Sequence, residues 1–392
     1  MTDQALAGLR VVELADFVAG AFCGKLLADF GADVIKVEPP GGCSLRAAFP
    51  VVRGDPERAG YFLALNTNKR SVTADIEHAD GVAVVKRLLL TADVVILESE
   101  GDMDTVGWVR GSLKPGAVLA SITPFGLSGP RTADLGGDLV ASAAGGLAFI
   151  TGEPDHPPLK AGAYQALHLA GLQAAASTLI AVFAARRRGV GQVVEVSMQE
   201  AVIAVLEATV PDFFLDGTVR SRMGTKHPTV HGLGMQQLRD GAWLFVGTLP
   251  TDAMWDGARA FMPDAEWMAD PRWRDPRTRR LHADEIDRLA AETFSKLNSH
   301  DAYEALQSRR IPVAIVNNVP GLLASAQLAS RRFFREIAHP IAGNLTYPGP
   351  ICQLSVTPAA EPRSAPTLGE HNQEIYMYEL GLSAEEFAAA CT

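Results

Sequence analysis

The sequence of 392 residues has few cysteines and no excess of basic residues. Its four cysteines, Cys23, Cys43, Cys352 and Cys391, form no C-x-x-C pair, which argues against a zinc module or a disulfide framework and favours a reduced, cytoplasmic setting. No apolar stretch approaches the about 20 residues that span a bilayer, and the start MTDQALAGLR does not resemble a signal peptide. We therefore expect a soluble, unprocessed protein with no membrane partner.

Acidic residues exceed basic ones, with 45 Asp and Glu against 35 Lys and Arg and a net charge of -10. This balance argues against a nucleic-acid partner bound through its phosphates. Hydrophobic residues make up 47% and charged residues 20%, which excludes a disordered chain.

Motifs of several common hydrolases are missing. The nine histidines have no H-E-x-x-H motif, and there is no G-x-S-x-G, P-loop or S-x-x-K. Serine and metal hydrolysis are therefore disfavoured, and no metal is predicted. Lys226, His227, Pro228 and His231 lie in a glycine-rich linker and could act as acid–base groups, although loop histidines without a partner are mostly structural or solvated.

The length and the hydrophobic pattern predict an α/β protein with more than one domain. β-branched runs at Leu9–Leu14 and Val34–Glu38 flank a helical pattern at Gly20–Phe30, which indicates a β-α-β unit and a parallel sheet. A long, buried helix is predicted over Gln165–Arg188. Further strands are predicted at 71–76, 92–97, 117–122 and 242–248, and further helices at 80–90, 198–208, 251–261, 283–297 and 300–309. We predict a large domain over 1–224, a smaller one over 225–330, and a segment 331–392 that returns to the large domain.

The turn Phe17–Ala21 lies between a predicted strand and a predicted helix. Backbone N–H groups there, beside small residues such as Val18 and Ala19, would let an anionic nucleotide lie against the main chain. The turn lacks G-x-G-x-x-G, so a dinucleotide site is not indicated, and tight packing is the alternative interpretation.

A second candidate is the segment 66–70, in which Asn68, Lys69 and Arg70 precede a predicted strand. Amides beside two cations could hold phosphate oxygens through charge-assisted hydrogen bonds. The alternative interpretation is a solvated turn.

Several segments, in order along the chain, resemble the class III (CaiB/BaiF) CoA-transferases. They are LAGLRVVELADFVAGAFCGKLLADFGADVIKVEPPGG, YFLALNTNKRSVTADI, SITPFGLSGP, GGDLVASAAGGLAFITGEPDHPPLKAG, and PTLGEHNQEI followed by LGLSAEE. The match covers nearly the whole chain, and its independent motifs have the right separations. The chain is therefore identified as a member of this family.

The resemblance implies a large Rossmann-like domain built from both chain ends, a smaller α+β domain, and an obligate dimer of two chains interlocked as rings. In active members CoA lies along the large domain, and one Asp attacks the acyl-CoA thioester. The carboxylate forms a mixed anhydride, the CoA thiolate converts it into an aspartyl-CoA thioester, and the incoming acid takes the CoA.

The family's Asp lies in a pattern like V-G-x-P-x-x-D-x-x-x-G, which corresponds to residues 161–171 of this chain. Aligned on Gly162 and Gly171, the place of the nucleophile is taken by Leu167. Leucine has neither lone pairs nor charge and cannot form an anhydride. No catalytic residue is therefore assigned in this chain.

The neighbours of Leu167 do not restore a nucleophile. His168 is adjacent, but successive helical residues point about 100° apart, so it would face another direction. Gln165 and Tyr164 could hydrogen-bond a carbonyl oxygen but could not hold the acyl group covalently.

A second departure concerns the segment near the CoA nucleotide. After the strand, family members usually continue with E-N-F-R-P-G, whereas this chain has Leu97–Gly101 (LESEG), which is one residue shorter. The carboxylates of this segment would repel CoA phosphates. The following D-R-x-G is replaced by DTVG, without the arginine. Five residues keep the family pattern and are the candidate CoA contacts of a weak, vestigial site: Val18, Ala19, Asn68, Lys69 and Arg70.

These features favour a nucleophile-lacking subunit of a heteromeric CoA-transferase, whose homologous partner carries the Asp and binds most of the CoA or acyl-CoA. The succinyl-CoA:(R)-benzylsuccinate CoA-transferases of anaerobic aromatic degradation are similar in having one such subunit, and the substrate rests on that analogy alone. Two alternatives stay open: a homodimeric CoA-binding or regulatory protein without catalysis, and an acyl-CoA epimerase-like enzyme.

Overall fold

The computed structural model describes residues 4–206, 208–226, 231–247, 249–262 and 264–391. The chain divides into two compact units. The first contains Met1–Phe149, Lys160–Val219 and Ser330–Thr392, and the second contains Ile150–Leu159 and Arg220–Ala329. The domain limits 1–224, 225–330 and 331–392 stay a prediction, and they did not anticipate that Ile150–Leu159 groups with the second unit.

The first unit is built on a six-stranded parallel sheet with the order β3-β2-β1-β4-β5-β6. Its strands are β1 (Arg10–Leu14), β2 (Asp33–Glu38), β3 (Arg70–Thr73), β4 (Val94–Glu98), β5 (Val118–Thr123) and β6 (Val193–Ser197). In register, Val12 of β1 lies opposite Ile35 on one side and Val95 on the other. The predicted α/β class and the β-α-β start are confirmed, and this strand order is that of the doubly wound nucleotide-binding folds.

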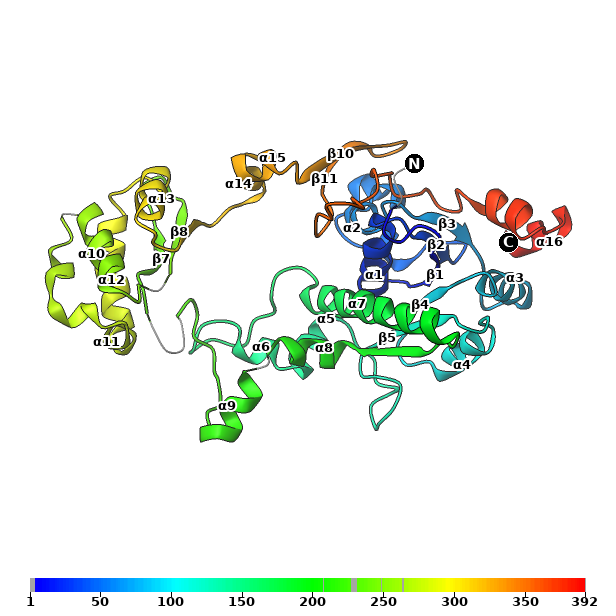
Figure 1. Ribbon diagram of the computed structural model, residues 1–392, viewed down its shortest axis with the longest axis horizontal. Helices are drawn as coiled ribbons and strands as arrows, with labels where there is room; N and C mark the ends of the chain where they lie inside the picture. Colours follow the sequence, from blue (N-terminus) through cyan, green and yellow to red (C-terminus); the bar gives the residue numbers. More distant parts are fainter. Residues whose placement is uncertain (1–3, 207, 227–230, 248, 263, 392) are drawn as a thin grey trace. The chain divides into compact units, whose positions relative to one another are not determined.

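Helices cover both faces of this sheet (Figure 1). α1 (Val18–Asp29) and α7 (Gln165–Arg188) pack on one face, and α3 (Ala79–Leu89), α4 (Met103–Gly111) and α16 (Ala384–Cys391) pack on the other. Successive strand residues alternate between the two cores, so that Val11 belongs to one and Val12 to the other. Because both faces are buried, the strands are continuous apolar runs, which is why the sequence predicted them.

Helix α7 has the bounds that the sequence predicts. It ends at Gly189 in the left-handed conformation, with three arginines in its last turn. By length and composition it could cross a membrane, so the expectation that no apolar stretch approaches that length was wrong, and half of its apolar window is buried in the protein. Gly171 allows α1 to approach closely, because a Cβ atom there would lie 2.5 Å from the Ala19 carbonyl oxygen.

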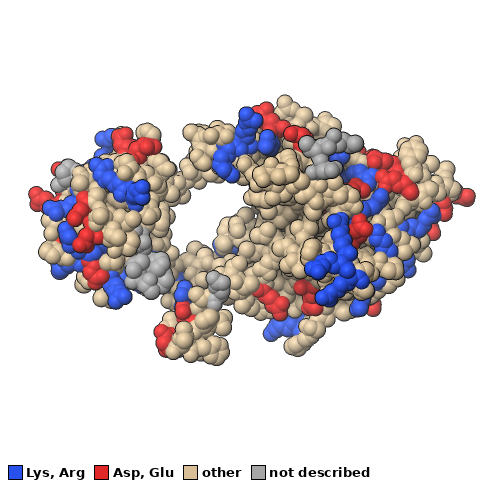
Figure 2. All heavy atoms as spheres, viewed as in Figure 1, with Lys and Arg blue, Asp and Glu red and all other residues tan. Residues whose placement is uncertain are grey.

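Shorter elements complete the first unit and its edges. They are α2 (Gly60–Leu65), α5 (Asp138–Ala144), α6 (Leu147–Ile150), α8 (Met198–Val205), α9 (Thr209–Asp216), the antiparallel hairpin β10 (Phe334–His339) and β11 (Gly343–Pro348), the 3-10 turns η1 (Ser44–Arg46), η2 (Val52–Gly54) and η3 (Pro56–Arg58), and the π-helical η6 (Gln373–Glu379). On the visible face of this unit, acidic and basic side chains are interspersed (Figure 2).

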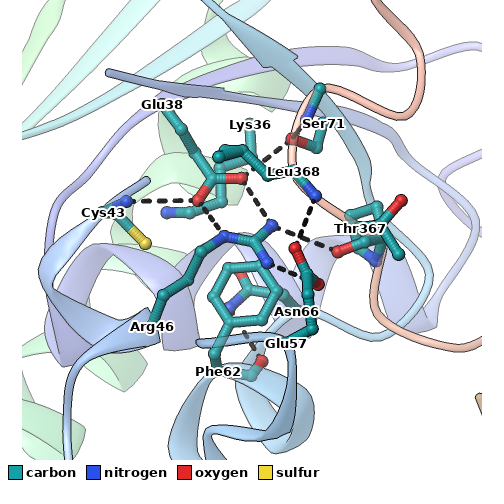
Figure 3. Close-up of polar contacts among 12 residues, drawn as sticks. Lys36, Glu38, Cys43, Arg46, Glu57, Phe62, Asn66, Ser71, Thr367 and Leu368 are labelled. Atoms are coloured by element: carbon teal, nitrogen blue, oxygen red, sulfur yellow. Dashed lines mark hydrogen bonds and ion pairs between the residues drawn. The ribbon is translucent and has the colours of Figure 1, made fainter. Parts of the chain in front are cut away.

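The C-terminal segment is attached to the first unit through a buried arginine (Figure 3). Arg46 lies 3.6 Å above the Phe62 ring and donates to Glu38 at 2.7 and 3.0 Å and to the Pro366 carbonyl at 3.2 Å. Although burial opposes the shift, hydrogen bonding by Arg46 lowers the pKa of Glu38 to about 2. Residues after 360 are thereby held against β2 and its following loop.

The second unit has a small antiparallel sheet, β7 (Gly234–Gln237), β8 (Trp243–Val246) and β9 (Val313–Ile315), in the order β7-β8-β9. Its helical elements are α10 (Asp252–Phe261), η4 (Glu266–Ala269), η5 (Pro271–Arg274), α11 (Pro276–Leu281), α12 (Ala283–Phe294), α13 (Ser299–Ser308), α14 (Val319–Leu323) and α15 (Ala326–Ser330). The helices predicted at 251–261, 283–297 and 300–309 are confirmed as α10, α12 and α13. A separate core containing Trp255, Trp273 and Phe294 stabilises this unit.

Candidate active site

The strand order of the first unit reverses between β1 and β4, and open parallel sheets bind ligands at the carboxyl ends of the strands at such a point. In this chain β1 leads into α1, and β4 ends at Glu98. The Glu98 carboxylate accepts hydrogen bonds from the backbone N–H groups of Phe17 at 3.2 Å and Gly20 at 3.1 Å. An anionic ligand would use donors of this kind at a helix start. The N-terminus of α1 therefore already holds a carboxylate of the chain itself.

The two predicted contacts in this turn, Val18 and Ala19, are fully buried in the first turn of α1. Gly20 beside them is required sterically, because a Cβ atom there would lie 2.4 Å from the Ala15 Cβ and 3.2 Å from Glu98. The turn is thus closely packed, as the alternative interpretation of the sequence held. Contact of these two residues with CoA stays a prediction.

Glu98 is expected to make stability depend on pH. Burial raises the pKa of this carboxyl from 4.5 to about 6, against the opposing hydrogen bonds from Gly20 and Phe17. Because the folded chain holds the proton more tightly than the unfolded chain, this contribution is full below pH 4.5 and is lost as the pH rises through 6. Urea unfolding measures the free energy of unfolding of Glu98→Gln and of the unsubstituted protein. The value for the variant minus that for the unsubstituted protein should therefore be higher at pH 8 than at pH 5.

The matched control for this experiment is Glu100→Gln, which alters an exposed carboxyl on the same loop. The free energy of unfolding of this control variant should differ from that of the unsubstituted protein by the same amount at both pH values. An identical pH dependence for the Glu98 and Glu100 variants would contradict the assignment.

Lys69 does not reach the surface. Its ammonium donates to Glu13 at 2.7 Å, to the Ala21 carbonyl at 2.7 Å and to Asn66 at 2.9 Å. Lys36 donates to the other Glu13 oxygen at 2.9 Å, and all three charged side chains are fully buried. Burial, opposed by Glu13, lowers the pKa of Lys69 to about 8. This buried triad fixes the start of α1 and leaves no Lys69 donor aimed at a phosphate.

Asn68 and Arg70 also have partners within the first unit. The Asn68 amide donates to Asp29 at 2.8 Å, and its oxygen accepts from the Arg363 backbone N–H at 2.7 Å. Arg70 is paired with Asp33 at 2.6 Å and with two glutamates of η6. The structure therefore uses Asn68, Lys69 and Arg70 internally, and their contact with CoA stays a prediction.

The loop after β4 carries acidic side chains at the carboxyl edge of the sheet. Asp102 caps α4 by accepting from the N–H groups of Asp104 at 3.0 Å and Thr105 at 3.3 Å. Gly101 has φ of 83°, and a Cβ atom there would lie 1.8 Å from the Thr132 carbonyl oxygen. Glu100 is exposed beside them. This loop therefore presents negative charge where the sequence predicts repulsion of CoA phosphates.

Leu167 lies in the first turn of α7 and is 2% exposed in the core of the first unit. The carboxylate of Asp138 accepts hydrogen bonds from the backbone N–H groups of Ala166 at 2.9 Å and Leu167 at 3.3 Å through one oxygen. Its other oxygen pairs with Lys160 at 2.8 Å. Asp138 thus serves the start of α7 as a helix cap, and its second oxygen, which accepts no hydrogen bond from a described residue, is paired with the Lys160 ammonium.

Tyr164, just before α7, forms edge-on contacts with Phe17 and Tyr61, with ring centres 5.2 and 5.0 Å apart. The His168 ring nitrogen lies 2.7 Å from the Tyr164 carbonyl oxygen, and its ring packs edge-on against Phe22. His168 is half-buried whereas Leu167 is buried, so the two side chains point in different directions, as the helical geometry predicts. Gln165 is exposed.

The linker candidates belong to the second unit. His231 is buried, with its Nε2 atom 2.6 Å from Asp287, and Lys226 pairs with Asp284. His227 and Pro228 lie outside the described residues. Among the residues that the structure describes, no group of three or more His, Cys, Asp or Glu side chains is arranged to hold a metal ion.

Comparison with known proteins shows what this arrangement is similar to. Residues 6–372 match the profile of "CoA-transferase family III". Succinyl-CoA–D-citramalate CoA-transferase of Chloroflexus aurantiacus is 32% identical, with 98% of this chain and 96% of that protein covered. The chain belongs to CoA-transferase family III.

Two further relatives of this class III CoA-transferase are informative. The beta subunit of succinyl-CoA–L-malate CoA-transferase from Chloroflexus aurantiacus is 30% identical, over 98% of this chain and 96% of that protein. The crystal structure of a CaiB/BaiF family protein from Brucella suis superposes with a TM-score of 0.86 at 29% identity, covering 96% and 99% of the two chains. The family thus contains both single-chain enzymes and named subunits.

Sequence reasoning missed Glu13 and Asp138, and it noted Glu98 only as a repulsive carboxylate and not as a group that holds α1. These side chains act on backbone or cations far along the chain, at separations of 23 to 81 residues. The available signal was a charged residue inside an apolar strand run, as in VVEL, which favours a buried ion pair over a surface position.

Proposed function

We propose that this chain is the non-nucleophilic subunit of a heteromeric acyl-CoA:carboxylate CoA-transferase. A homologous partner supplies the aspartate that forms the anhydride and the aspartyl-CoA thioester. This chain contributes the fold of its half of an interlocked dimer, in the cytoplasm, and by itself does not transfer CoA.

The observation that carries the proposal is the hydrocarbon side chain at the family's nucleophile position. Leu167 is 2% exposed, so the side chains around it are packed closely against an apolar group. Asp138, the carboxylate beside it, is committed to two N–H groups and to Lys160. Covalent catalysis needs an oxygen nucleophile at the family's position, and Leu167 offers none.

The carboxyl edge of the sheet, where the strand order reverses between β1 and β4, supports a second part of the proposal. This part is that the partner binds most of the CoA. Glu98 occupies the N–H groups of α1, and Lys69 is held by Glu13. The exposed Glu100 adds negative charge at the same edge. Phosphates approaching this edge would meet carboxylates instead of free cations.

For the substrates we propose succinyl-CoA as donor and a dicarboxylic acid as acceptor. Both Chloroflexus relatives act with succinyl-CoA, and their acceptors are D-citramalate and L-malate. (R)-Benzylsuccinate shares the succinate skeleton and adds an aromatic ring, and it is the acceptor that the sequence resemblance favours.

The test is to purify this chain by an affinity tag from its native host, identify co-purifying chains by mass spectrometry, and assay CoA transfer from succinyl-CoA. The acceptors are benzylsuccinate, citramalate and malate. We expect a homologous chain with Asp at the family position, and activity only when both chains are present.

Two controls separate the proposal from its alternatives. Asp→Asn in the partner's family position should abolish transfer, whereas the volume-conserving Leu167→Met in this chain should keep it within about twofold, because the side chain takes no part in chemistry. Full transfer by this chain alone would contradict the proposal. Purification of a homodimer that neither transfers CoA nor has a homologous partner would favour a regulatory protein instead.

A further inference from the structure

A large cavity lies at the opposite edge of the sheet from Glu98. It has a volume of about 880 Å³ and is bounded by the end of α1, the starts of β2 and β3, the β10–β11 hairpin and the segment after it. All of these belong to the first unit. Cavities that hold small molecules typically measure about 300–1,000 Å³. This one is separate from the carboxyl edge of the sheet, at which the start of α1 lies.

The floor of the cavity contains a hydroxyl group without a partner. Tyr347 of β11 lines the cavity and is 6% exposed, and no described residue hydrogen-bonds its hydroxyl. Leaving such a group unsatisfied costs about 1–3 kcal/mol, so a buried hydroxyl without a protein partner needs an acceptor from outside the chain, either a water molecule or a ligand. Around it, Ile337, Phe333 and Leu354 supply apolar surface. An occupant therefore needs an apolar body and a hydrogen-bond acceptor.

The rim of the cavity is positively charged. Lys and Arg side chains gather at the start of the β10–β11 hairpin on the face in Figure 2. Arg332 and Arg335 line the cavity, are exposed, and have no ion pair with any described residue. The Arg363 guanidinium, also in the lining, donates to the Asn68 carbonyl oxygen at 3.0 Å.

The acidic residues of the lining do not cancel this charge. Asp29 is paired with Lys25 at 2.8 Å, and Asp33 is paired with Arg70 at 2.6 Å. Glu361 is the acidic lining residue that has no ion pair among the residues the structure describes. Three guanidinium groups thus face one carboxylate, and guanidinium groups bind carboxylates and phosphates through paired N–H donors.

We propose that this cavity is a second binding site, for an organic anion with an apolar body. Its anionic group lies on the guanidinium groups of Arg332 and Arg335, its hydrophobic part rests on the floor, and an acceptor atom receives the Tyr347 hydroxyl hydrogen. The anion is a carboxylate or a phosphate, which two different probes distinguish.

The experiment is isothermal titration calorimetry of the full-length chain with benzylsuccinate and with adenosine 3′,5′-bisphosphate, and with succinate as the probe that lacks an apolar body. We expect one of the first two probes to bind and succinate to bind more weakly. The double variant Arg332→Gln/Arg335→Gln should weaken binding of that probe by about tenfold or more, because charge-assisted hydrogen bonds are lost. Arg331→Gln, an exposed neighbour outside the lining, should change it less than about twofold.

Tyr347→Phe separates ligand binding from structural support. It should weaken binding by about three- to tenfold, while the urea midpoint of the free protein stays the same or rises, since an unsatisfied hydroxyl is removed. Absence of binding by both probes at millimolar concentration would overturn the proposal. So would binding that the double variant and Arg331→Gln change equally, because the probe would then lie elsewhere.

Discussion

Replacing Leu167 with Asp is expected to leave the isolated chain unable to transfer CoA and to lower its free energy of unfolding by about 3 kcal/mol or more. Leu167 is 2% exposed, and the new carboxylate would lie beside the carboxylate of Asp138, which already pairs with Lys160. A nucleophile placed there would be neither solvated nor oriented. Denaturant unfolding and an assay of CoA transfer from succinyl-CoA measure the two effects.

Two substitutions at the same position separate the causes. Leu167→Asn has nearly the same shape as the Asp variant but no charge, so it should lose less stability. Leu167→Met conserves volume and should cost less than about 1.5 kcal/mol. If Leu167→Asp by itself reached the rate of the assembled enzyme, only the nucleophile would have been missing, and the inferred loss of CoA binding would be wrong.

The second large effect is expected at Glu13. Glu13→Gln leaves Lys36 and Lys69 fully buried without the carboxylate that both contact, at 2.9 and 2.7 Å. Removing one partner of a buried ion pair typically costs about 3–5 kcal/mol, because the remaining charge stays desolvated. Urea unfolding should therefore show a midpoint far below that of the unsubstituted protein.

The control for the Glu13 variant is Glu336→Gln on β10. Glu336 is exposed and has no ion pair among the described residues, so its loss should change stability by less than about 0.5 kcal/mol. Equal destabilisation by both substitutions would show that the triad contributes no more than a surface carboxylate. In that case the buried ion pairs would not be what fixes the start of α1.

The elements of the sheet could be predicted because their signals are local. The strand Leu9–Leu14 and the helix Gln165–Arg188 follow from β-branched runs and from an apolar helix that ends in arginines and a glycine. The structure places them at Arg10–Leu14 and Gln165–Arg188. Leu167 could likewise be located from the sequence, since its alignment needs only the two flanking glycines.

The roles of the cations could not be predicted, because their partners are distant in sequence. Asn68, Lys69 and Arg70 have the composition of a phosphate-binding segment, yet Arg70 pairs with Asp33, 37 residues away, and with Glu379, 309 residues away. A pattern along the chain does not reveal such carboxylates. The cavity at Tyr347 was missed for the same reason, since it forms only when the hairpin β10–β11 packs beside α1.

The most direct test of the central claim is the intact mass of each subunit after rapid acid quenching during turnover with succinyl-CoA. We predict that the homologous partner gains the mass of a covalent acyl or CoA adduct, while this chain keeps its unmodified mass. An adduct on any side chain of this chain would contradict the account.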